Sequence, residues 1–192
     1  MMKFIISLIA FLLLLENAFC QDSYTLEKDI DGDNIADTIR LDSAKSCIVC
    51  QLSGENFTPV YSPEIYLDNM NGMGSSLGDT KDGFYYSFNW MRAGESICFR
   101  YEPETKRIRA VSYYSYAFGN AANDGKNDLN FDLLTGKCSG VSYYFDYEKE
   151  ELIPNKIELE ISVPLMYLED FDTGLIMEAY EKALTLSSSN TN

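Results

Sequence analysis

FYYSFNWMRAGESICFRYEPETKRIRAVSYYSY (residues 84–116) carries the clearest structural pattern in the chain. Large apolar residues alternate with polar ones in three short runs, at 84–91, 96–102 and 107–116, and this two-residue period is typical of half-buried β-strands. The sequence Glu-Pro-Glu-Thr at 102–105 separates the last two runs and is typical of a tight turn. The segment therefore predicts consecutive antiparallel strands joined by hairpins.

The same alternation continues on both sides of this segment. Further strands are predicted at 24–28, 38–42, 47–52, 129–134, 141–147 and 156–163. Thr-Gly at 135–136 should close another hairpin, whereas 69–83 contains four glycines and is interpreted as a flexible loop. The expected fold is all-β, an antiparallel sandwich or barrel, because a long open sheet edge invites aggregation.

One amphipathic helix is predicted near the C-terminus, where Asp172 can cap a helix over 173–186. The residues that share its apolar face are Ile176, Tyr180, Ala183 and Leu184. This helix is expected to cover an end or edge of the sheet. The polar tail 187–192 is expected to be disordered, so residues 21–186 should form a single β domain.

The N-terminus has the pattern of a signal peptide, predicted over residues 1–20. A basic residue precedes an uninterrupted apolar run at 4–15, which is too short to span a bilayer. Ala18 and Cys20 place small residues three and one positions before Gln21, so cleavage is expected after Cys20. The predicted product is secreted, periplasmic or extracellular, and has no transmembrane span. The alternative is a lipoprotein anchored through Cys20.

The amino-acid composition limits which binding partners and which types of catalytic site the chain can have. Acidic residues exceed basic ones by 15, and there is no histidine. The negative charge disfavours nucleic acid as a partner and favours a cationic one. Without histidine, Ser-His-Asp and Cys-His catalysis and an ordinary catalytic zinc site are excluded. A glycosidase-type carboxylate pair stays open, but the residues predict a protein that is not an enzyme.

Four cysteines follow the predicted signal peptide, and in an oxidising compartment they should be buried or disulfide-linked. Cys47 and Cys50 are three residues apart on one predicted strand, so they face opposite sides and a mutual disulfide is disfavoured. A zinc site is disfavoured because no second C-x-x-C pair follows. Cys98 and Cys138 are predicted to pair, since both are assigned to strands of the central sheet.

The acidic motif DIDGDNIAD at 29–37 is the strongest chemical signal. Calcium takes about six to eight oxygens, and carboxylates at loop positions 1, 3, 5 and 9 with a carbonyl at 7 can surround it. The expected ligands are the carboxylates of Asp29, Asp31, Asp33 and Asp37 and the carbonyl of Ile35. Position 12 is Arg40 instead of a bidentate glutamate, and the chain continues as a strand. The motif predicts an EF-hand-like calcium loop between strands, with water or Asp42 as a further ligand; an acidic surface turn is the alternative.

Aromatic, glycine-rich segments at 84–94 and 113–120 are a second chemical signal. Aromatic rings exposed on a sheet stack on sugars, and Trp90 would be the natural platform. The same pattern is also typical of the core of a β-sandwich. A carbohydrate-binding module of the periplasm or cell surface is therefore an alternative function.

Several motifs together carry a family resemblance. They are the acidic loop, Cys50-Gln-Leu-Ser53, Phe88-Asn-Trp-Met-Arg-Ala-Gly94, Phe99-Arg-Tyr-Glu-Pro-Glu-Thr-Lys106, Phe118-Gly-Asn-Ala-Ala-Asn-Asp-Gly125 and Leu133-Leu-Thr-Gly136. With these motifs, the chain from about 29 to 170 resembles secreted bacterial proteins grouped with a periplasmic immunity protein. That immunity protein neutralises a peptidoglycan-cleaving toxin of a type IV secretion system and is similar to inhibitors of invertebrate-type lysozyme.

The resemblance implies a β-sandwich or barrel, a structural calcium loop and a protruding loop that plugs the cleft of a muramidase. Lysozyme inhibitors carry a Ser-Gly loop followed by an aromatic residue, and Ser139, Gly140 and Tyr143 fit that order. Lys137 is the nearest candidate for the basic residue that such inhibitors place between the catalytic carboxylates. The implied function is a secreted, calcium-binding, non-enzymatic inhibitor of lysozyme-like peptidoglycan hydrolases, with a protein partner.

Overall fold

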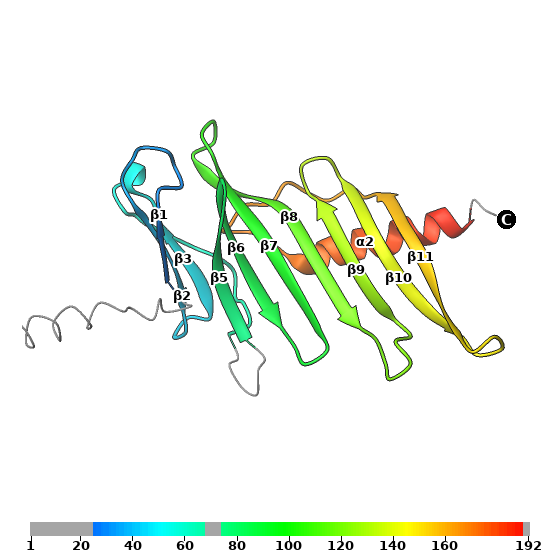
Figure 1. Ribbon diagram of the computed structural model, residues 1–192. Helices are drawn as coiled ribbons and strands as arrows, with labels where there is room; N and C mark the ends of the chain where they lie inside the picture. The colour runs from blue at the N-terminus through cyan, green and yellow to red at the C-terminus, as the bar shows by residue number, and fades with distance from the viewer. Residues whose placement is uncertain (1–24, 68–73, 190–192) are drawn as a thin grey trace, which may run out of the picture.

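The computed structural model describes residues 25–67 and 74–189, and its strands form two antiparallel sheets with one C-terminal helix (Figure 1). The predicted signal peptide and the possible anchor at Cys20 lie outside the described residues. The strands of the smaller sheet, in their spatial order, are β1 (Thr25–Lys28), β2 (Asp37–Asp42), β3 (Cys47–Gln51) and β4 (Pro59–Tyr61). A 3-10 turn, η1 (Ser53–Glu55), lies between β3 and β4.

The larger sheet has seven strands, and each pairs with its neighbours in the chain. They are β5 (Gly74–Thr80), β6 (Gly83–Asn89), β7 (Ala93–Glu102), β8 (Arg107–Phe118), β9 (Lys126–Asp132), β10 (Lys137–Asp146) and β11 (Glu151–Glu160). Because β5 and β11 are its two edges, the described sheet is open and does not close into a barrel. The connections β6–β7, β8–β9 and β10–β11 all emerge at one end, the lower end in Figure 1.

The hairpins predicted around 84–116 and at 135–136 are confirmed. Phe84 of β6 pairs directly with Phe99 of β7, and the turn after β7 ends at Lys106 with a left-handed φ of 55°. Gly136 has a φ of 75° in the β9–β10 turn, a conformation that glycine adopts without a steric penalty. Local alternation and turn residues therefore agree with the observed strand pairing.

Two strands were not predicted. β4 is only three residues long, and β5 lies in the glycine-rich segment that the sequence assigns to a flexible loop. Gly78 of β5 pairs with Tyr85 of β6, and a Cβ atom on Gly78 would lie 2.1 Å from the Tyr85 ring. The glycine thus makes room for a neighbouring aromatic side chain, which is a tertiary role that its own sequence does not reveal.

One hydrophobic core joins the small sheet, the helix and one face of the large sheet, here called the inner face. The ring of Phe99 packs edge-on against Phe171 at a centroid distance of 5.2 Å, and the ring of Phe131 packs against Tyr180 at 5.7 Å. An ion pair between Lys28 of β1 and Asp79 of β5 links the two sheets at 2.5 Å. The opposite, outer face of the large sheet carries the alternate residues of each strand.

The C-terminal helix, α2 (Thr173–Ser189), lies against the inner face behind the later strands (Figure 1). The Asp172 carboxylate accepts a 2.8 Å hydrogen bond from the Gly174 amide, as expected of an N-cap, and Ile176 and Tyr180 are buried. The helix ends three residues later than predicted, so the expected tail 187–192 is helical at 187–189, and 190–192 lie outside the described residues. In the described ranges, no helix has the length and apolar character needed to cross a membrane.

The predicted Cys98–Cys138 disulfide is wrong. Cys138 pairs with Phe131 on the inner face, whereas Cys98 precedes the inward-facing Phe99 and points to the outer face. β8 and β9 also separate the two residues, which places them about 14 Å apart at three strand spacings. All four cysteines in the described part of the chain are free thiols, including Cys47 and Cys50.

Candidate functional site

The acidic loop predicted to bind calcium connects β1 to β2. Asp37 opens β2 and is fully buried, and its carboxylate accepts hydrogen bonds from the Ile30 amide at 2.7 Å and the Asp31 amide at 3.3 Å. Asp29 accepts from the amides of Gly32 and Asn34 at 2.7 Å and 2.9 Å. These bonds fold the loop back on itself, so its carboxylates converge.

The structure brings three of the predicted ligands together. One carboxylate oxygen each of Asp29, Asp31 and Asp37 lies within 4.8 Å of the others, a grouping that could hold a metal ion. Burial, with a contribution from Asp37, raises the pKa of the Asp31 carboxyl, and the Gly54 amide opposes that shift. Carboxylate oxygens of this kind suit a hard divalent cation.

The other two predicted ligands lie differently. The Asp33 carboxylate accepts the Ile35 amide at 2.7 Å and the Ser53 hydroxyl at 2.9 Å, and Asp33 is not a member of the converging triad. The side chain of Ile35 is exposed. Asn34 has a φ of 68°, a left-handed conformation that asparagine adopts more readily than most residues.

Sequence reasoning about the loop missed the contribution of η1. The Ser53 amide donates to one Asp37 oxygen at 2.8 Å, and the Gly54 amide donates to Asp31 at 3.0 Å. The Ser53 hydroxyl lies 3.0 Å from the same Asp37 oxygen and shares its one hydrogen between Asp37 and Asp33. A Cβ atom on Gly54 would lie 2.6 Å from that Asp31 oxygen. Ser53 follows Asp37 by 16 residues, and the only available signal was its place at the end of one of the motifs of the resemblance.

The residues expected to form an inhibitory loop lie within a strand. Ser139 and Gly140 of β10 are paired with β9 on one side and with β11 on the other, so they cannot project from the sheet. A Cβ atom on Gly140 would lie 2.1 Å from the Asp128 carbonyl oxygen, which shows how closely the β9 backbone approaches. Lys137 begins the same strand, and Tyr143 lies further along it. The centroid of the Tyr143 ring is 5.1 Å from the Lys126 ammonium nitrogen.

A second candidate site is formed by the β6–β7 and β8–β9 connections. Arg92 donates from Nε to the Gly119 carbonyl at 2.9 Å and from Nη2 to the Asn120 carbonyl at 3.2 Å. The Phe118 amide in turn donates to the Arg92 carbonyl at 2.8 Å. These two connections belong to motifs that carry the family resemblance, and the fold joins them at one end of the sheet.

The β8–β9 connection is also fixed on its other side. The Gly125 amide donates to the Tyr143 carbonyl at 3.0 Å, and the Phe145 amide donates to the Asp124 carboxylate at 3.0 Å. The Asn120 carboxamide accepts the amides of Ala122 and Asp124 within the loop. This connection is therefore held by both of its neighbours.

Large apolar side chains are exposed on these connections. Trp90 is 40% exposed, Met91 77% and Phe118 49%, and we call the end of the sheet that carries these three residues the aromatic end. The Trp90 ring packs edge-on against the buried Phe88 ring at 4.6 Å, which holds Trp90 in place. Rigid, exposed aromatic and Met side chains are typical of protein-binding surfaces.

An aromatic row runs along β8 on the outer face of the large sheet. Tyr114 and Tyr116 have ring centroids 6.0 Å apart, and Tyr116 and Phe118 are 5.4 Å apart; these three residues are called the outer row. The Tyr114 hydroxyl donates to Asp128 and the Tyr116 hydroxyl to Asn89. Their hydroxyls are thus held while the rings lie on the outer face.

Comparison of the chain with family models, with curated proteins and with solved structures found no match. The acidic triad, the aromatic end and the outer row are therefore the features of the molecule that indicate its function.

Proposed function

We propose that this chain is a secreted, non-enzymatic binding protein that inhibits a lysozyme-like peptidoglycan hydrolase through its aromatic end. The single observation that carries this proposal is the Arg92 contact, which joins the two connections that carry the exposed Trp90, Met91 and Phe118. Its two packed sheets serve as a β-sandwich scaffold, and export would place the protein in the periplasm or outside the cell.

The chemistry of the aromatic end suits a protein partner. Tryptophan and arginine are enriched at binding hot spots, and a surface that is already ordered loses little entropy on binding. The excess of 15 acidic residues would accelerate encounter with a cationic hydrolase, mainly through the association rate. The predicted Ser139–Gly140 loop has no part in this proposal, because those residues lie inside β10.

We also propose that the acidic loop binds calcium as a structural ion. Asp29, Asp31 and Asp37 would supply carboxylate oxygens, and the remaining positions would be taken by the Ile35 carbonyl, Asp33 or water. Calcium is preferred to magnesium because protein oxygen cages suit the larger ion. The ion would hold the β1–β2 connection against η1 and would take no part in inhibition.

Inhibition is tested with the chain beginning at Gln21 and a panel of chicken-, goose- and invertebrate-type lysozymes in a cell-wall lysis assay. We expect stoichiometric inhibition of at least one enzyme, with an association rate that falls as salt rises. The double variant Trp90→Ala/Met91→Ala should weaken inhibition by about a hundredfold, on the scale of a hot spot. The control Tyr147→Ala changes an exposed ring on the β10–β11 connection and should have little effect. Absence of inhibition at micromolar protein would reject the proposal.

Glycan binding is the second candidate, favoured by the outer row. Sugar rings stack on aromatic faces, and the 6.0 Å and 5.4 Å spacings present successive rings on one sheet surface. Peptidoglycan fragments should then bind the wild-type chain and lose affinity in Tyr114→Ala, while the Trp90→Ala/Met91→Ala variant binds them normally. The opposite pattern would assign the glycan to the aromatic end.

A further inference from the structure

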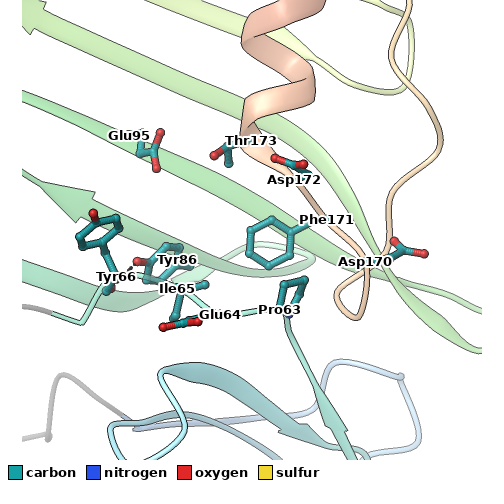
Figure 2. Close-up of a pocket in the computed structure, with 10 residues that line it drawn as sticks. All are labelled: Pro63, Glu64, Ile65, Tyr66, Tyr86, Glu95, Asp170, Phe171, Asp172 and Thr173. Carbon is teal, nitrogen blue, oxygen red and sulfur yellow. Dashed lines mark hydrogen bonds between the residues drawn. The ribbon is translucent and has the colours of Figure 1, made fainter.

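A cavity of about 400 Å³ lies where the two sheets meet the start of α2 (Figure 2). Its floor is formed by the segment 63–66 after β4, its side by β6 and β7, and its roof by the residues that lead into the helix. It is separate from the acidic triad, the aromatic end and the outer row. The volume is sufficient for a small organic molecule.

Carboxylates and aromatic rings line this cavity, and none of the described residues that line it is a lysine or an arginine. The acidic residues around it are Glu64, Glu95, Asp170 and Asp172. Two of them are already compensated, because Asp170 pairs with Arg107 at 3.3 Å and Asp172 caps the helix. Within the described residues, neither Glu64 nor Glu95 forms an ion pair.

Glu95 projects from β7 on the inner face, where it is only partly accessible (Figure 2). The Tyr113 hydroxyl donates a 2.6 Å hydrogen bond to one of its carboxylate oxygens, and within the described residues this is the only hydrogen bond of the Glu95 side chain. Burial raises the pKa of the Glu95 carboxyl, while the Tyr113 hydroxyl opposes the shift. A cation in the cavity would supply the missing charge partner.

The rings of Tyr86 and Phe171 form apolar walls of the same cavity (Figure 2). Both residues are buried, and the Tyr86 hydroxyl donates to the Tyr66 carbonyl at 2.6 Å, so its hydrogen is not available to a ligand. Aromatic faces attract cations and pack against alkyl chains. A cavity lined by the Glu95 carboxylate and two aromatic rings therefore favours a ligand that has a positively charged group and a short alkyl chain.

We propose that this cavity binds a small organic cation with a primary ammonium head, with Glu95 as its charge partner and Tyr86 and Phe171 as its walls. The inference does not depend on inhibition or on calcium. Glu64 at the mouth would add a weaker, screened attraction. The neutral analogue of the same ligand would leave Glu95 buried and unpaired, which gives the site its preference for charge.

The proposal is tested by calorimetric titration of the chain beginning at Gln21 with n-butylammonium chloride and, in parallel, with n-butanol. We expect saturable binding of n-butylammonium with a millimolar dissociation constant, and binding of n-butanol about tenfold weaker. Glu95→Gln keeps an acceptor for Tyr113 and should weaken n-butylammonium binding about tenfold. Phe171→Leu should weaken it about threefold, as loss of a cation–π contact does.

The matched control is Glu148→Gln, which removes an exposed carboxylate on the β10–β11 connection and should leave the affinity within about twofold of the wild type. Circular dichroism spectra establish that each variant is folded. Equal affinities for n-butylammonium and n-butanol, unchanged affinity in Glu95→Gln, or no saturable binding would each overturn the proposal. Lysozyme inhibition measured on Glu95→Gln keeps the two sites distinct, since we expect it to be retained.

Discussion

Arg92 Nε donates a 2.9 Å hydrogen bond to the carbonyl oxygen of Gly119, which lies 27 residues further along the chain. A second nitrogen of the same guanidinium reaches the Asn120 carbonyl at 3.2 Å. The planar fork of arginine can bridge several carbonyls at once, which a lysine ammonium on a flexible stem does poorly. The Arg92 side chain therefore joins the β6–β7 and β8–β9 connections, together with the backbone hydrogen bond from the Phe118 amide to the Arg92 carbonyl.

Replacement of Arg92 should loosen these connections without unfolding the protein. We expect Arg92→Ala to lower the free energy of unfolding by only about 1 kcal/mol, because its hydrogen bonds are exposed to solvent. Amide hydrogen exchange should accelerate at 118–125 and stay unchanged in β9. Arg92→Lys retains the charge but should resemble alanine in exchange. A lysine variant with wild-type protection would show that charge alone holds the connections.

Calcium should stabilise the fold through the acidic triad. An ion bound only by the native state adds about 2.7 kcal/mol at a hundredfold excess over its dissociation constant. The melting temperature should rise in millimolar calcium and fall in chelator, and Asp31→Ala should abolish this response. The control Asp82→Ala removes an exposed carboxylate from the β5–β6 turn and should leave the response intact. Identical melting curves with calcium and chelator would contradict a structural ion.

Gly78 should not tolerate a side chain, since a Cβ atom there would lie 2.1 Å from the Tyr85 ring. We expect Gly78→Ala to lower the free energy of unfolding by about 2 kcal/mol, in the range of other overpacking changes. Tyr85→Ser removes the ring, so the double variant should lose much less than the sum of the two single changes. Denaturant unfolding of all four proteins measures this coupling. Additive losses would mean that Gly78 acts through backbone freedom alone.

Glu95 should make stability depend on pH. Because burial raises its pKa in the folded state, the folded chain binds the proton more tightly than the unfolded chain. Protonation of Glu95 therefore stabilises the folded chain. This contribution to the free energy of unfolding is fully present below the pKa of Glu95 in the unfolded chain, and it is lost as pH rises through the pKa in the folded chain. Glu95→Gln cannot ionise, so its melting temperature should exceed that of the wild type at neutral pH, and the excess should shrink on acidification. An excess independent of pH would assign the effect to packing.

Much of the strand pattern could be predicted from the sequence because alternation and turn chemistry are local. Gly136 and Asp172 act on residues within a few positions, and both were assigned correctly. β5 was not predicted because its Gly78 leaves room for the ring of Tyr85 on the neighbouring strand, and this relation is not visible in the local sequence. The predicted Cys98–Cys138 pairing was wrong for a related reason, since assignment to strands of one sheet does not determine which strands are neighbours or which face each residue occupies.

The spacing of aspartates in 29–37 determined that carboxylates would converge in the loop, because backbone amides two to seven residues away can reach them. Only the tertiary structure placed Ser53 and Gly54 on those carboxylates and brought Arg92 to Gly119. It also placed Glu95 and Phe171 in the lining of one cavity. The physical reason is the distance along the chain over which each preference acts. Alternation and turns depend on steric and hydrogen-bonding preferences among residues only a few positions apart. Packing of two sheets and a helix instead joins residues tens of positions apart, and no local preference encodes those contacts.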